Sequence, residues 1–148
     1  MYEFRTLDDT DPLLLAAPVM RALDFLLRQF QENAKGIPLT KTLSFKRAFV
    51  AEAIIEIHWH DWSAEDIYKR VRVADEDHFY PLSALHDLLL ELKLVRNFKQ
   101  HLRLTKQGAV LAKSRFKFFH EMAQVILFRD MHFARSRNSG YIMGNWDI

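Results

Sequence analysis

One stretch decides the fold of this chain, residues 92–108, which read Leu92-Lys93-Leu94-Val95-Arg96-Asn97-Phe98-Lys99-Gln100-His101-Leu102-Arg103-Leu104-Thr105-Lys106-Gln107-Gly108. It predicts two short strands, at about 94–98 and 101–104, joined by a basic turn. A helix is expected to begin at Thr105, whose side chain can cap it, and Gly108 allows close packing against the strands. Alternation along the strands predicts three inward-pointing residues, Leu94, Leu102 and Leu104.

The spacing of apolar residues predicts four helices before the strand pair and one long helix after it. Their expected ranges are 11–33, 44–59, 64–71, 81–92 and 105–130. Asp11 and Pro12 resemble an N-cap followed by a proline in the first turn, and Ser63 resembles a second N-cap. Gly36 suits the left-handed position at which a helix stops. Two segments look irregular, residues 1–10 and 131–148.

Composition favours one compact, mainly α-helical domain. The chain has 148 residues, of which 49% are hydrophobic and 12 are Phe, enough to build a core at this length. Gly and Pro number only four each, which disfavours an all-β fold rich in turns. There is no Cys, which excludes disulfides, thiolate metal sites and Cys nucleophiles.

The sequence shows no secretory signal, and its apolar runs fall far short of the roughly 20 residues that a membrane helix needs. Together with the lack of Cys, this predicts a cytoplasmic protein with no membrane partner.

Charge falls in blocks along the chain. Residues 63–92 contain seven acidic and three basic residues, whereas residues 93–117 contain eight Lys or Arg and no Asp or Glu. A folded domain with such blocks can present a basic face that attracts polyanions. The alternative is an ordinary solvated face with charged helix ends.

The wing motif carries a resemblance to a known fold. Leu94-Val95-Arg96 and the following Leu102-Arg103-Leu104-Thr105-Lys106-Gln107-Gly108 resemble the wing that ends many bacterial winged-helix regulators. The fold class implied is mainly α, a winged-helix core with a two-stranded wing hairpin and with flanking N- and C-terminal helices. The expected parts are an N-terminal helical extension at 1–38, the winged-helix core at 39–113, and a C-terminal helix with an irregular tail at 114–148.

A second resemblance rests on three short segments. Pro38-Leu39-Thr40-Lys41-Thr42 and Lys46-Arg47-Ala48-Phe49-Val50 resemble a box shared by uncharacterised bacterial proteins, some of them plasmid-encoded, and Gly144-Asn145-Trp146-Asp147 resembles a later segment of the same proteins. In that group the pattern continues as an apolar helix, so the resemblance implies that this chain stops early. It supports the fold and assigns no activity.

The helix expected at 81–92 is poorly suited to reading DNA bases. In winged-helix DNA binders the corresponding helix enters the major groove, where Arg, Lys, Asn or Gln read base edges. The side chains expected to point outward here are Ser83, His86, Asp87 and Glu91, with Leu90 beside them. The Asp87 and Glu91 carboxylates would repel the phosphates that line a DNA groove.

The wing suits phosphate contacts better. The candidate nucleic-acid-binding residues are Arg96, Lys99, His101, Arg103 and Lys106. Such contacts give an affinity that falls with salt and little sequence specificity. Lys41, Lys46 and Arg47 either extend this basic surface or form the outer face of an amphipathic helix. A winged helix used for protein interaction alone is nearly as well supported.

No group of residues predicts a catalytic or metal site. His58-Trp59-His60-Asp61 ends a helix, where residues two apart diverge. His120-Glu121 lacks the second His of a zinc motif because position 124 is Gln. Residues 75–78 lack the alternation and Gly of a calcium loop, so an exposed acidic connector is expected there. The sequence therefore predicts no enzyme, no metal and no cofactor.

The first and last long helices are more apolar than one small core requires. The fifth helix alone contains a run of large apolar residues, Phe116, Phe118, Phe119, Met122, Ala123, Val125, Ile126, Leu127 and Phe128. Exposed apolar area of this kind usually marks an interface, so a homodimer through these helices is expected. The alternatives are cover by a missing C-terminal segment and simple burial against the core.

The sequence thus predicts a non-enzymatic regulatory or accessory module that is dimeric and binds nucleic acid, such as DNA, weakly through a basic wing. The alternative is a winged-helix protein-interaction or dimerisation domain with an unknown protein partner and no nucleic-acid role.

Overall fold

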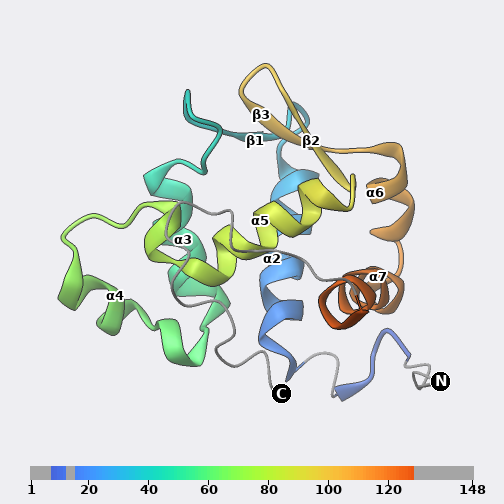
Figure 1. The fold of residues 1–148 in the computed structure, drawn as a ribbon, viewed down its shortest axis with the longest axis horizontal. Helices are drawn as coiled ribbons and strands as arrows, with labels where there is room; N and C mark the ends of the chain where they lie inside the picture. Colours follow the sequence, from blue (N-terminus) through green and yellow to red (C-terminus); the bar gives the residue numbers. More distant parts are fainter. Residues whose placement is uncertain (1–7, 13–15, 129–148) are drawn as a thin grey trace.

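The computed structural model describes residues 8–12 and 16–128, with the backbone alone for 125–128. The fold is mainly helical with a small antiparallel sheet, as expected, and is consistent with a winged-helix-like arrangement (Figure 1). Its α-helices are α2 (Pro18–Glu32), α3 (Arg47–Ile57), α4 (Ala64–Arg70), α5 (Tyr80–Glu91), α6 (Lys106–Leu111) and α7 (Arg115–Phe128). Its strands are β1 (Ile37–Pro38), β2 (Val95–Phe98) and β3 (His101–Leu104), and two 3-10 turns are η1 (His60–Trp62) and η2 (Glu76–His78).

The sheet has three strands in the order β1-β3-β2, one more than the sequence predicted. The added strand follows Gly36, whose φ of +97° turns the chain after α2. Ile37 then lies opposite Leu102 and is fully buried. Gly36 is required here, because a Cβ would lie 2.4 Å from the carbonyl oxygen of Leu102.

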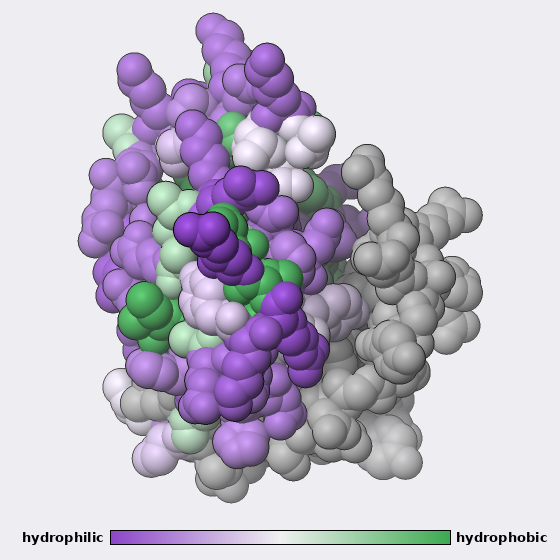
Figure 2. Space-filling model, turned by 90° about the vertical axis from the view of Figure 1, so that its left-hand side faces the viewer, coloured by the Kyte–Doolittle hydropathy of each residue, from purple (hydrophilic) through white to green (hydrophobic). Residues whose placement is uncertain are grey.

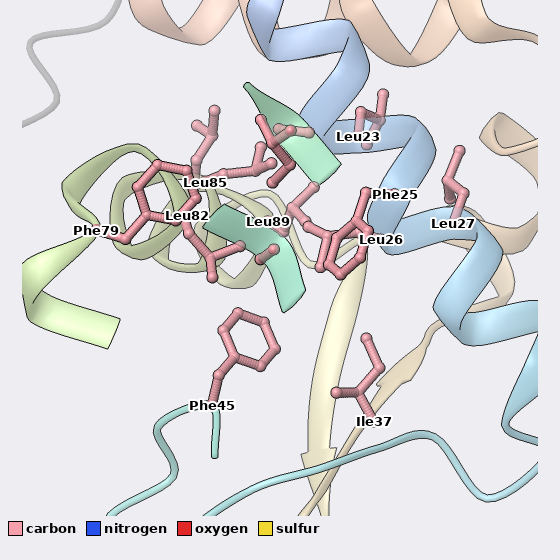
Figure 3. Packing of buried hydrophobic residues seen from close by; sticks show 14 of the residues in the cluster. Leu23, Phe25, Leu26, Leu27, Ile37, Phe45, Phe79, Leu82, Leu85 and Leu89 are labelled. Atoms are coloured by element: carbon pink, nitrogen blue, oxygen red, sulfur yellow. The ribbon is translucent and has the colours of Figure 1, made fainter. Parts of the chain in front are cut away.

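The core lies between α2, α3 and α5, with the sheet at one end. In Figure 3, side chains of α2 and α5 point toward one another, and Phe45 and Ile37 lie at the end of the cluster near the sheet. Helix α2 is buried on several sides within this one chain, which explains its wide apolar stripe. Its buried residues are Met20, Ala22, Leu23, Phe25, Leu26, Leu27 and Gln29.

Three predicted helices have different bounds in the structure. The helix expected over 44–59 is α3, Arg47–Ile57. The single helix expected over 11–33 is interrupted at Ala17, which is extended, as residues before proline tend to be, so α2 begins at Pro18. Pro12 and Ala16, before the interruption, are themselves helical. The single helix expected over 105–130 is two helices, broken between Leu111 and Arg115. At the break, Asp9 accepts hydrogen bonds from the Ser114 hydroxyl and from the Phe116 backbone N–H, so a distant residue caps α7.

Some expectations lie outside the described residues. These are the irregular segments at 1–7 and 131–148, the Gly-Asn-Trp-Asp match at 144–147, and the apolar side chains of Val125, Ile126, Leu127 and Phe128. No helix in the described part of the chain is long and apolar enough to span a membrane.

Candidate nucleic-acid interface

The β2–β3 hairpin presents one basic face, because residues alternate between the two sides of a strand. Arg96 lies opposite Arg103, and Phe98 lies opposite His101, so these four side chains share one side. The other side includes Leu102, which is fully buried. Strand bounds of 94–98 and 101–104 were therefore predicted almost correctly, and Leu94 and Leu102 are buried as expected, with Leu104 half-buried.

Three cations of the predicted site surround one aromatic ring at the end of the hairpin. The Arg103 guanidinium carbon lies 4.7 Å from the Phe98 ring centroid. The Arg96 guanidinium and the Lys99 ammonium each lie 5.4 Å from the same centroid. We call Arg96, Phe98, Lys99 and Arg103 the wing-tip cluster. Phe98 is 37% exposed, so part of this large apolar side chain is open to solvent.

The wing-tip cluster concentrates positive charge that the protein itself does not neutralise. Arg96 and Arg103 are directly opposite on paired strands, an arrangement that is unfavourable for like charges. In the described ranges none of the three cations forms an ion pair. Four other Arg or Lys side chains do, for example Arg47 with Asp75 and Arg115 with Asp24. A bound anion would relieve this repulsion.

The turn that presents the cluster is held from several sides. Lys99 and Gln100 have φ values of +48° and +58°, the pattern of a two-residue type I′ turn. The Gln100 carbonyl accepts a hydrogen bond of 2.8 Å from the Leu39 backbone N–H. His101 Nδ1 donates to the Lys99 carbonyl at 2.8 Å, since a carbonyl oxygen can only accept.

Arg103 has a second role besides contributing charge. Its Nε donates to the Lys35 carbonyl at 2.8 Å, which ties β3 to the segment before β1. The remaining guanidinium nitrogens are the ones available for an anion. Arg103 and His101 are accordingly half-buried, whereas Arg96 and Lys99 are exposed.

Lys106, the fifth predicted site residue, lies away from the cluster. It is exposed and begins α6, beyond the end of β3 that is opposite the turn. The residues around Lys106 form the base of the wing, where β3 joins α6. Thr105 accepts from the Gly108 N–H at 3.0 Å and donates to the Lys93 carbonyl at 2.8 Å, so its predicted cap is confirmed.

The segment at 39–45 brings one further cation toward the tip. The hydrogen bond from Leu39 to Gln100 places the exposed Lys41, two residues on, near the wing turn. Arg47 does not extend the basic surface, because its Nε lies 2.6 Å from an Asp75 carboxylate oxygen. Figure 2 shows one side of the molecule, on which hydrophilic residues predominate toward the top, where Figure 1 places the hairpin.

His86 is not outward-facing as predicted but is buried in α5, with 3% of its surface exposed. Its Nδ1 lies 2.7 Å from Oε1 of Glu76, and Oε2 of Glu76 accepts from the Phe45 backbone N–H at 2.7 Å. The Phe45 ring lies 4.4 Å from the imidazole. Glu76 is 6% exposed, so the segment at 75–78 is not the fully exposed acidic connector that was expected.

What α5 leaves on the surface is acidic. Asp87 and Glu91, one turn apart, are its exposed residues, and Ser83 and Leu90 are half-buried. The pKa of Asp87 is raised, chiefly because its carboxyl group is partly desolvated even though the residue as a whole is exposed. The His86 charge opposes this shift, and the Glu76 and Asp77 carboxylates add to it. This strip would repel phosphate.

The other charged groups that line surface hollows are largely paired. A hollow of about 730 Å³ is lined by Arg28 and Glu56, which form an ion pair, and by Arg115 and Asp24, 2.9 Å apart. In the part of the chain that is described, no group of three or more His, Asp or Glu side chains could hold a metal ion.

Phe98 is the residue that the charge-based prediction missed. It occupies the centre of the cluster, and its position could have been found from the sequence, since it is two residues from Arg96 on the same strand and therefore shares its side. The contacts of Asp9 with Ser114 and Phe116, and the buried Glu76–His86 pair, could not be found from residues adjacent in the sequence.

Comparison with known proteins places the chain in a family. The family model described as "Y4jL N-terminal domain" matches residues 15–117, which include every residue of the wing-tip cluster. The chain is also 28% identical, over 137 residues, to a protein of Sinorhizobium fredii (strain NBRC 101917 / NGR234) described as "Uncharacterized protein y4jL". This match covers 93% of the chain but only 61% of that relative, so the chain spans about three fifths of it. No solved structure matches the chain. The chain belongs to the Y4jL N-terminal domain family.

Proposed function

We propose that this chain is a cytoplasmic, non-enzymatic accessory module of winged-helix type that binds nucleic acid weakly through its wing. The observation that carries the proposal is the wing-tip cluster, in which Arg96, Lys99 and Arg103 lie together without an acidic partner among the described residues. A cluster of this kind attracts the phosphate backbone and reads little sequence.

Helix α5 limits the proposal to backbone contacts. Base reading in the major groove needs an exposed helix with donor side chains. The exposed residues of α5 are instead Asp87 and Glu91, and its histidine is buried. The proposed complex therefore has the wing against phosphates and α5 away from the groove.

The test is binding of a fluorescent random-sequence duplex at about 50 and 200 mM salt, the range over which phosphate contacts lose most affinity. We expect a dissociation constant in the range of about 10⁻⁶ to 10⁻⁴ M that weakens steeply with salt. Replacing Arg96, Lys99 and Arg103 together by Ala should make the plot of log affinity against log salt shallower by up to about 3.

Lys117→Ala is the matched control, because Lys117 is an exposed cation on α7, away from the wing (Figure 1). It should leave both affinity and salt slope close to the wild type. An effect of Lys117→Ala equal to that of Arg96→Ala alone would show that only net charge matters, and no binding at low salt would refute the proposal.

A protein-interaction role is the second candidate, and α7 favours it. Phe118 and Met122 of this helix are buried in the core, but Phe116 and Phe119 are only partly covered. A homodimer through α7 would cover them, whereas α2 offers little exposed apolar surface for the predicted two-helix interface. Light scattering at tens of micromolar tests this role: a dimeric mass supports it, and a monomeric mass rules out the homodimer.

A further inference from the structure

We propose that the wing-tip cluster binds single-stranded nucleic acid in preference to duplex, with an unpaired base stacked on Phe98 and the flanking phosphates held by Arg96, Lys99 and Arg103. This inference rests on the proposed nucleic-acid binding and names the form of nucleic acid that the same site takes. It assigns a direct role to Phe98, which phosphate binding alone does not require.

The first argument is the composition of the cluster. An aromatic ring surrounded by cations matches the two needs of single-strand binding, which are a platform for the base face and charge for the backbone on either side of it. The ring centroid lies 4.7 Å from one guanidinium and 5.4 Å from the two other cationic groups, so a stacked base would have phosphate ligands within reach. In a duplex, base faces are stacked on one another and only their edges line the grooves.

The second argument is the position of Phe98. On the same strand, Val95 turns inward and is only 2% exposed. Phe98 instead lies on the outer side of the hairpin, next to the turn, and remains 37% exposed. The cations already near the ring are attracted to its face, and a nucleotide would add a base that stacks on the exposed part of the ring and a phosphate that pairs with the cations.

The third argument is preorganisation. The turn at 99–100 is anchored by the Leu39–Gln100 hydrogen bond, and β3 is anchored by the bond from Arg103 to the Lys35 carbonyl. A ring and three charges held in this way lose little conformational freedom on binding. Little of the binding free energy is therefore lost in ordering the wing.

The experiment compares four labelled probes of about 12 nucleotides on the full chain at about 50 mM salt. They are a single-stranded DNA, the single-stranded RNA of the same sequence, the corresponding duplex, and a strand of the same length in which abasic spacers replace the bases. The abasic strand keeps the phosphate charge and removes the stacking partner. We expect the DNA strand to bind about tenfold more tightly than the abasic strand, as one stacked base would give, and more tightly than the duplex. The RNA arm shows whether the sugar affects the site.

Substitutions then separate the ring from the charge. Phe98→Leu keeps an apolar side chain and should remove most of the tenfold difference while leaving abasic-strand binding and the salt slope unchanged. Phe98→Tyr keeps the ring and should retain the difference. Arg96→Ala should weaken all four probes. A circular dichroism spectrum matching the wild type checks that each variant is folded.

The outcomes distinguish the two proposals. Equal affinity for base-containing and abasic strands, or a Phe98→Leu variant that binds like the wild type, would overturn the stacking role and leave phosphate binding standing. Tighter binding of the duplex than of either single strand would also overturn it. Failure of all four probes to bind would instead refute the proposed function itself.

Discussion

The β2–β3 hairpin and helix α5 are neighbours in the sequence and opposites in chemistry. The hairpin presents Arg96, Lys99 and Arg103 around an exposed ring, whereas α5 presents Asp87 and Glu91 and buries its only histidine. In a groove-reading winged helix both regions would face nucleic acid. In the described part of this chain the hairpin has chemistry suited to phosphate and α5 does not, so a winged-helix-like arrangement need not imply groove reading.

The difference follows from what each region packs against. On the outer side of the hairpin, Arg96 and Lys99 stay in solvent, and Arg103 is half-buried by its bond to the Lys35 carbonyl. Helix α5 packs against α2 on one side, and the carboxylate of Glu76 reaches its histidine from η2. The buried imidazole and carboxylate stabilise the arrangement of loop and helix, because Glu76 also holds the Phe45 backbone.

The largest expected effect is on the base of the wing. A Cβ on Gly108 would lie 1.9 Å from the Leu94 carbonyl oxygen, so Gly108→Ala forces backbone to move. We expect a loss of about 4 kcal/mol in the free energy of unfolding, at the upper end for overpacking. Urea denaturation measures it, with the exposed Gln107→Ala as the control. A loss below about 1 kcal/mol would show that the wing is not seated on α6 in this way.

The next effect concerns α5. Glu76→Ala leaves a buried imidazole and the buried Phe45 N–H without their 2.7 Å partners. Breaking a buried pair of this kind should cost about 3 kcal/mol in urea denaturation. Glu65→Ala removes an exposed pair with Lys69 on α4 and should cost no more than about 0.5 kcal/mol. Similar costs for the two variants would contradict the buried network.

The smallest effect should be seen at Asp87, and it depends on pH. Because the pKa of Asp87 is raised in the folded protein, the folded state binds this proton more tightly than the unfolded chain. Ionisation therefore costs stability at pH 7, and that cost is absent below the ordinary value of 3.8. Asp87→Asn should stabilise the protein at pH 7 by about 0.5 kcal/mol, since solvent screens the group, and the gain should vanish in acid.

Thermal unfolding from pH 3 to pH 7 measures this gain, and the same variant sharpens the comparison between the two regions. If nucleic acid contacts only the wing, Asp87→Asn should leave affinity nearly unchanged. A rise in affinity as large as the loss caused by Arg96→Ala would place nucleic acid along α5.

Local signals explain what could be predicted from the sequence. The two wing strands, the Thr105 cap and the close approach at Gly108 depend on residues a few positions apart, and they are confirmed. The same alternation could have identified Phe98. His86 was placed outward because helical spacing alone cannot show that a carboxylate ten residues earlier is buried beside it.

Contacts over longer distances were beyond sequence reasoning. Strand β1 is held by the pairing of Ile37 with Leu102. The start of α7 is capped locally by Ser114, which accepts from the Lys117 N–H, and from far along the chain by Asp9. Of the candidate site residues, the structure brings Arg96, Lys99 and Arg103 together around Phe98. Lys106 lies at the start of α6 and is not part of the cluster.

The most direct test of the central claim is a two-dimensional ¹H–¹⁵N NMR titration with a 12-nucleotide single-stranded DNA. Binding by the wing predicts that the largest shift changes fall at residues 96–103, with smaller ones at Leu39, whose N–H bonds to Gln100 in the turn. The exposed strip of α5 at Asp87 and Glu91 should not respond. Dominant shift changes along that strip, with an unperturbed wing, would contradict the account.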